Sequence, residues 1–146
     1  MKVIQTKECI SLPLSADTLY DTILDITKYY LWWPSKIELN VLNITPDFIN
    51  AELEVKPPTM GTNFSVRIIE LVPNQKIVFQ YFEGIQQGTG TWTFSPADNA
   101  HTTVCYEVDV TAKGLLINLV PTEELIRIQQ KFIQDLFAGL KKHFNI

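Results

Sequence analysis

Side chains that could act as nucleophiles, bases or metal ligands are few and scattered in this sequence. The histidines are His101, in a predicted turn, and His143, in the last turn of a predicted helix. The cysteines are Cys9 and Cys105, both in predicted strands. A serine or cysteine nucleophile needs a base within hydrogen-bond reach, and no His/Cys/Asp/Glu cluster has the spacing of metal ligands. The sequence thus gives little support for a catalytic triad or dyad and predicts no metal site.

Arg67 is the most notable polar residue, because it lies in the middle of a predicted strand between Val66 and Ile68. If its side of the strand faces inward, the guanidinium could pair with a ligand carboxylate or enolate, or with Glu8 or Glu52. Otherwise Arg67 is a solvated residue on the outer face, with its stem on its neighbours. The sequence leaves both interpretations open.

Aromatic residues make up 11% of the chain, with three Trp, five Tyr and eight Phe. Several occupy alternating positions in predicted strands, so they share one face of a sheet: Phe79, Tyr81, Trp92, Phe94 and Tyr106. These rings either fill a solid core or line an apolar pocket. The Tyr81 and Tyr106 hydroxyls need partners if they are buried, and either a ligand or a neighbouring side chain could supply one.

The elements that must position these residues follow from periodicity and turn signals. Alternation predicts strands over residues 6–12, from 36 onward, and over 48–55, 63–72, 76–82, 88–95 and 102–110. A helix follows Ser15 as N-cap, and a second short helical segment covers residues 27–31. Thr122 is the predicted N-cap of a final amphipathic helix of about 20 residues. Connections this short between strands require an antiparallel meander, with the long helix covering one face.

Composition excludes several functional classes. Twelve Lys and Arg stand against sixteen Asp and Glu, for a formal charge of −4, so a general nucleic-acid binder is not expected. No apolar run reaches the length of a membrane-spanning helix. The first eight residues lack the apolar core of a signal peptide, which predicts a cytoplasmic protein. The length fits one domain over residues 1–146.

Three stretches carry a resemblance to a known superfamily. They are residues 10–21 with Asp25, Tyr29-Tyr30 and Trp32-Trp33-Pro34; residues 88–96 leading to 103–108; and the terminal helix. The sequence resembles the START-related helix-grip domains, also called SRPBCC, and most of all their bacterial polyketide cyclase/dehydrase and lipid-transport branch. The resemblance implies an α+β helix-grip fold in β-α-α-β6-α order. In that fold a seven-stranded curved antiparallel sheet wraps around the C-terminal helix, with a cavity between them.

The resemblance also implies a hydrophobic small-molecule ligand, such as a lipid, quinone or polyketide, held without a cofactor. One of the two adjacent indoles packs in the core, and the other either sits at the cavity mouth or caps the barrel end. Residues 56–61 and 114–120 are either lids, with Met60, Leu115 and Leu116 as an adaptable gate, or ordinary loops. The residues expected to bind ligand are Trp33, Met60, Phe79, Tyr81, Trp92, Tyr106, Leu115, Leu119, Phe132 and Leu136.

Two alternatives stay open beside simple binding. One is an enzyme of the cyclase/aromatase type, whose candidate groups for stabilising an enolate are Arg67, Tyr81 and Tyr106. The other is a protein-interaction or respiratory accessory module, which would expose a large apolar patch. In helix-grip proteins the first and last strands are neighbours, which would bring Cys9 and Cys105 close. A disulfide between them is not expected in a reducing cytoplasm.

Overall fold

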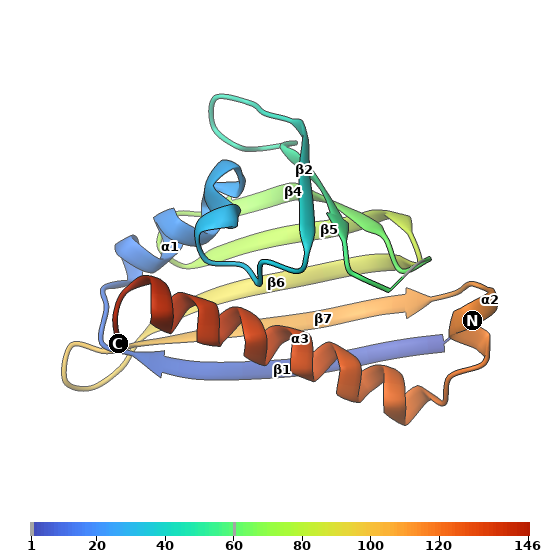
Figure 1. Cartoon of the computed structure of the whole chain (residues 1–146). Coiled ribbons are helices and arrows are strands. Elements are labelled where there is room, and N and C mark those ends of the chain that lie inside the picture. Colours follow the sequence, from blue (N-terminus) through green and yellow to red (C-terminus); the bar gives the residue numbers. More distant parts are fainter. Residues whose placement is uncertain (1, 60) are drawn as a thin grey trace.

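Seven strands form one antiparallel sheet in the order β1-β7-β6-β5-β4-β3-β2. The computed structural model describes residues 2–59 and 61–146. The strands are β1 (Lys2–Leu12), β2 (Glu38–Asn43), β3 (Glu52–Lys56), β4 (Phe64–Val72), β5 (Lys76–Gly84), β6 (Gln86–Pro96) and β7 (Thr102–Ala112). The helices are α1 (Ala16–Leu24), the 3-10 helix η1 (Ile26–Leu31), α2 (Leu115–Asn118) and α3 (Thr122–His143). Apart from the short α2, this confirms the predicted order and the helix-grip fold (Figure 1).

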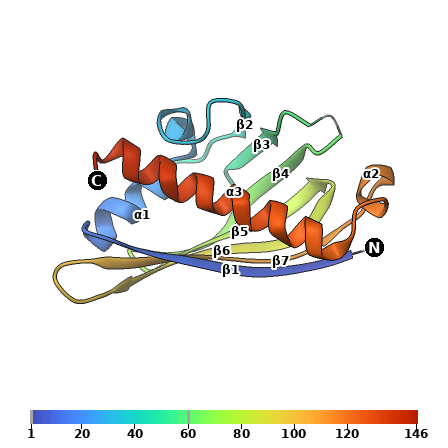
Figure 2. The ribbon, with the colours of Figure 1, turned by 60° about the horizontal axis from the view of Figure 1, so that its bottom comes forward.

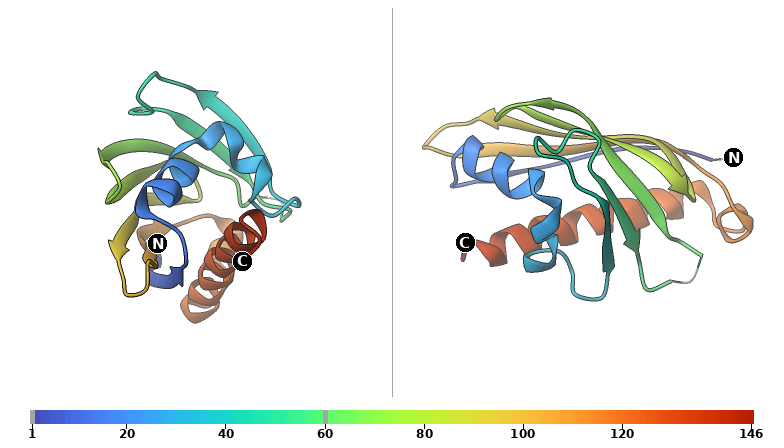
Figure 3. Two further views of the ribbon diagram at one scale, coloured as in Figure 1. Left: turned by 90° about the vertical axis from the view of Figure 1, so that its left-hand side faces the viewer. Right: turned by 90° about the horizontal axis from the view of Figure 1, so that it is seen from above.

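The core lies between the sheet and α3, which runs along the concave side of the curled sheet (Figures 2 and 3). Strand β7 shows why: Val104, Tyr106, Val108 and Val110 are buried, as their alternation predicts. Helix α3 buries a complementary stripe of Leu125, Gln129, Ile133, Leu136, Phe137 and Leu140. Burial of both surfaces from water is what holds the helix in the sheet.

The C-terminal half of α3 packs closely against the end of η1. A Cβ atom at Gly139 would overlap the backbone carbonyl oxygen of Trp32. Trp32 is buried, and its ring meets Tyr29 edge-on at 5.2 Å between centroids. Glycine at position 139 is therefore what allows η1 and α3 to approach so closely.

Several local predictions differ from the structure, and the strand expected over residues 6–12 begins already at Lys2. The strand expected over residues 48–55 begins only at Glu52, because Phe48 and Asn50 adopt left-handed backbone conformations with φ of 67° and 68°. Residues 115–118 form α2, although their apolar pattern has no clean period. The N-cap of α3 is Pro121 and not Thr122, which is the first residue of the helix. The carbonyl oxygen of Pro121 accepts a hydrogen bond from the N–H of Leu125. Proline suits this position because it precedes the helix, where the N–H that proline lacks would have no partner within the helix.

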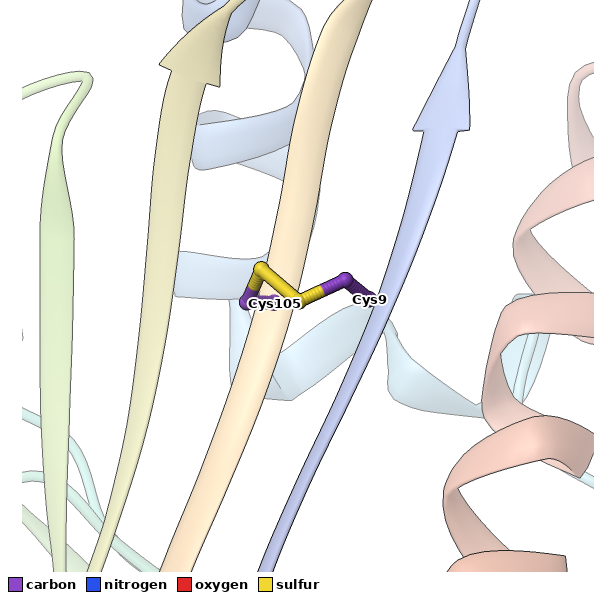
Figure 4. Close-up of a disulfide and its surroundings, with 2 residues drawn as sticks. All are labelled: Cys9 and Cys105. Carbon is purple, nitrogen blue, oxygen red and sulfur yellow. A yellow bond between two sulfur atoms is a disulfide. The ribbon is translucent and has the colours of Figure 1, made fainter.

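A disulfide joins Cys9 of β1 to Cys105 of β7 (Figure 4). The expectation that no such bond forms was wrong, because it rested on an assumed reducing compartment and ignored the register. Cys9 and Cys105 are direct partners across the two strands, with Cα atoms 4.1 Å apart. Cys105 alternates with the buried residues Val104 and Tyr106, so the bond lies on the outer face of the sheet.

Reduction of this disulfide should destabilise the protein, because it closes a loop with a sequence separation of 96 residues. We expect dithiothreitol to lower the free energy of unfolding by about 2–4 kcal/mol, measured by urea denaturation. The double variant Cys9→Ser/Cys105→Ser is the control and should not respond to reductant. Two alkylatable thiols in the folded, unreduced protein would show that the bond is absent.

Candidate functional site

Aromatic and aliphatic side chains from the sheet and α3 close around a small inner pocket. Its lining residues are Tyr29, Trp33, Leu53, Val55, Phe64, Val66, Phe79, Tyr81, Trp92, Tyr106, Phe132 and Leu136. Its volume is about 20 Å³, which is room for roughly one water molecule. Ring contacts fill the rest: Trp92 lies 4.6 Å from Tyr106 and Phe64 lies 5.4 Å from Tyr81, measured between centroids. For most of its length, therefore, the interior is a packed core.

Tyr81 of β5 and Tyr106 of β7 meet inside this pocket, with their hydroxyl oxygens hydrogen-bonded at 2.7 Å. The intervening strand β6 makes room for the pair, since a Cβ atom at Gly90 would overlap the Tyr106 hydroxyl. Burial raises the pKa of Tyr81 to about 12 and raises the pKa of Tyr106 well above its ordinary value. Both phenols are therefore neutral hydrogen-bonding groups at physiological pH.

A larger cavity of about 270 Å³ opens at the other end of the interior. It lies between the first turns of α3, α2 and the ends of strands β1, β6 and β7, the region at the right of Figure 1. Its lining residues are Ile4, Pro57, Thr59, Thr62, Phe64, Ile85, Gln86, Ala112, Ile117, Val120, Leu125, Ile128, Gln129 and Phe132. Phe64 and Phe132 line both spaces, so these two rings separate the outer cavity from the inner pocket.

The ten residues expected to bind ligand do not all line the same space. Seven of them line the inner pocket: Trp33, Phe79, Tyr81, Trp92, Tyr106, Phe132 and Leu136. Of these seven, Phe132 alone also lines the outer cavity. Leu115 and Leu119 are 83% and 76% exposed and line neither space. Met60 lies outside the described residues, as does the side chain of Leu116.

Arg67 lies on the outer face of the sheet and not in the site. Its Nε and Nη2 atoms bind one Glu52 carboxylate oxygen at 2.7 and 2.6 Å, and its guanidinium lies 4.3 Å from the centre of the Phe82 ring. The neighbours Val66 and Ile68 point into the core. Alternation along the strand therefore directs Arg67 away from both cavities. On the outer face it pairs with Glu52, which was one of the partners that the sequence left open.

Two polar residues of the outer cavity were missed by the sequence reasoning. Gln86 is the first residue of β6 and shares its face with Trp92. Gln129 stands one helical turn from both Leu125 and Ile133 on the buried face of α3. Their spacing could have identified both as inward-facing: Gln86 by two-residue alternation along its strand, and Gln129 by four-residue spacing along its helix. Both were overlooked because glutamine is not apolar. Both are at least nine-tenths buried.

Little in the described residues supports nucleophilic or metal chemistry. Both cysteines are in the disulfide, and His101 Nδ1 contacts the Asn99 carbonyl in a turn. The part of the chain that the structure describes holds no cluster of three or more His, Cys, Asp or Glu side chains able to bind a metal ion. No helix within it is long and apolar enough to cross a membrane.

Ionisation of the tyrosine pair should destabilise the fold at alkaline pH. The pKa of Tyr81 is raised from about 10 in the unfolded chain to about 12 in the folded protein. The stabilisation is therefore complete below pH 10 and is lost as pH rises through 12, a change of about 2–3 kcal/mol. Urea denaturation of the Tyr81→Phe variant should show a shallower loss of stability above pH 10. Tyr30→Phe, at a 73% exposed position, is the matched control, and an unchanged slope in Tyr81→Phe would contradict this account.

Comparison with known proteins gives similar chains of the same architecture. Ribosome association toxin RatA of Escherichia coli is 25% identical over 134 residues, covering 91% of this chain and 84% of that protein. A START superfamily protein from Mycobacterium smegmatis superposes with a TM-score of 0.76 at 17% identity, covering 94% of each chain. The Zhui aromatase/cyclase from Streptomyces sp. R1128 superposes with a TM-score of 0.71 at 13% identity, covering 97% of this chain and 90% of that one. At such identities the solved structures establish the shared fold.

A protein family matches most of the sequence directly. Residues 12–137 match the family described as "Polyketide cyclase / dehydrase and lipid transport". The matched segment runs from the last residue of β1 into the C-terminal half of α3, so it includes both the inner pocket and most of the outer cavity. The resemblance noted from the sequence is confirmed. The chain belongs to the polyketide cyclase/dehydrase and lipid transport family of START-like helix-grip domains.

Proposed function

We propose that this protein binds a hydrophobic small molecule in the outer cavity between the sheet and the N-terminal half of α3. The observation that carries the proposal is the apolar space of about 270 Å³ there. An apolar cavity of about 150 Å³ can hold a benzene molecule. By that measure the outer cavity suits a molecule of one or two rings, or an alkyl chain of about ten carbons.

The inner pocket is a poor site for the same ligand. It has room for about one water, and its hydroxyl groups already satisfy each other through the Tyr81–Tyr106 hydrogen bond. A cyclase-type reaction on a polyketide would have to reach those hydroxyls past Phe64 and Phe132. The third candidate group, Arg67, is paired with Glu52 on the outer face. Binding is therefore better supported than catalysis.

A substitution that fills the outer cavity should abolish binding without unfolding the protein. Ala112 is 1% exposed, lines the cavity and ends strand β7. In Ala112→Phe the ring would occupy the space, so we expect affinity for the neutral two-ring fluorescent probe 1-aminonaphthalene to fall at least tenfold. The melting temperature should hold or rise, since a void is filled. Fluorescence titration and a thermal scan measure the two effects.

Thr111→Phe is the matched control, because the neighbouring side chain points to the opposite face of the sheet. It should bind the probe like the unmodified protein. If Ala112→Phe binds the probe as tightly as the unmodified protein does, the probe binds outside this cavity. If neither the unmodified protein nor the variants bind the probe, the proposal is wrong. Native mass spectrometry of the protein as purified tests independently for a retained ligand.

A second candidate function is association with a macromolecular partner. Two observations favour it: the relative RatA is named for ribosome association, and Leu115, Leu119 and Ile128 are more than half exposed near the outer cavity. Large exposed apolar side chains grouped in this way mark interaction surfaces more often than scattered ones do.

Co-sedimentation with ribosomes tests this candidate. The double variant Leu115→Ser/Leu119→Ser should reduce the co-sedimenting fraction several-fold, because it removes two apolar side chains that are 83% and 76% exposed. Val3→Ser, at an exposed apolar position on the outer face of β1, is the control. Absence of co-sedimentation by the unmodified protein would argue against this candidate and leave ligand binding untouched.

A further inference from the structure

The Cys9–Cys105 disulfide lies on the outer face of the sheet, away from both cavities, and neither cysteine lines either space. Cys9 is exposed on the edge strand β1, and Cys105 is half-buried on β7. In Figure 4 the helical ribbons lie behind or beside the strands that carry the bond.

The side chains around the bond on this face are polar. The neighbours two residues away along each strand, and the partner of Cys105 on β6, are Lys7, Ser11, Thr103, Glu107 and Thr93. No large apolar side chain is among them, so the bond is open to a small reagent from the solvent side.

The backbone of the two strands holds the cysteines together without help from the bond. Cys9 and Cys105 are direct partners in an antiparallel register that runs from Lys2 and Ala112 to Leu12 and Thr102. Their Cα atoms are 4.1 Å apart, close to the separation of about 4.5 Å in a non-hydrogen-bonded antiparallel pair. Because the ladder already supplies this separation, the strands need not part when the bond breaks. The two thiols then stay adjacent, and the bond can form again.

We propose that Cys9 and Cys105 form a reversible thiol–disulfide exchange site, which reacts with small thiols and small disulfides while the protein stays folded. This inference goes beyond the proposed function, since the reaction involves neither the outer cavity nor its ligand.

The reaction balances with a dithiol as the reductant. One thiolate of the dithiol attacks a sulfur atom of the bond, which forms a mixed disulfide and releases the other cysteine as a thiolate. The second thiol of the reductant then displaces the mixed disulfide. The protein gains two electrons and two protons as a pair of thiols, and the reductant leaves as its disulfide. A small disulfide such as oxidised glutathione reverses the reaction through the same two exchanges.

The rate of reduction distinguishes exchange in the folded state from exchange through unfolding. Dithiothreitol would be added at one pH to the folded protein and to the urea-unfolded chain, with timed alkylation and mass spectrometry to count thiols. We expect the folded protein to react less than about a hundredfold more slowly. Reaction through global unfolding would be slower by about a thousandfold or more, because native proteins populate the unfolded state at about one part in a thousand or less. A slowdown above a hundredfold would overturn the proposal.

Both redox forms should be folded. We expect the far-ultraviolet circular dichroism spectrum to be unchanged after full reduction, and oxidised glutathione to restore the bond in most molecules. Loss of the folded spectrum on reduction, or failure of the bond to form again, would overturn the proposal.

The single variants Cys9→Ser and Cys105→Ser are a matched pair that tests access to each sulfur without the bond. Oxidised glutathione should add one glutathionyl group to each folded variant, and faster to Cys9 because it is the more exposed of the two. The double variant Cys9→Ser/Cys105→Ser is the control and should gain none. If neither folded single variant is modified, the site is closed to small thiol reagents and the proposal is wrong.

Discussion

The packing of one amphipathic helix inside a curled sheet is the constraint on which the rest of this structure depends. Helix α3 is held closely at its C-terminal half, where Gly139 lets the Trp32 carbonyl approach its backbone. Toward its N-terminus the same helix lines the outer cavity with Leu125, Ile128 and Gln129. The cavity is thus a consequence of a helix that packs tightly at one end and less tightly at the other.

The aromatic residues of the interior stabilise the closed end. The rings of Trp92, Tyr106 and Phe137 are in contact, and the Tyr81–Tyr106 hydrogen bond satisfies two hydroxyls that burial removes from water. These rings pack against one another, and the two hydroxyls are each other's hydrogen-bond partner. The many aromatic residues that suggested a pocket in the sequence therefore mostly form a packed core. Chemistry that requires free polar groups is left to the open end of the molecule.

Much of the fold could be predicted from the sequence, because alternation and helical spacing are local signals. Val104, Tyr106 and Val108 alternate as a half-buried strand must, and the final helix has a clear apolar stripe. The two cavities could not be told apart, since their volumes depend on how neighbouring elements meet. The Cys9–Cys105 bond depends on the register of β1 against β7, which the sequence alone does not determine. Gln86 and Gln129 show that a polar residue at a core position carries information that a search for apolar stripes discards.

Two of the described residues line both the outer cavity and the inner pocket. Phe64 comes from β4 and Phe132 from α3, and each contacts both the outer cavity and the inner pocket. The depth to which an occupant can enter is therefore set by single residues that the sheet and the helix do not need for their hydrogen bonding. Exchanging either ring for a smaller side chain would lengthen the available space toward the tyrosine pair. Related chains could in this way diverge in the size of molecule they accept, and even bring an occupant to a pair of phenols, while the scaffold stays the same.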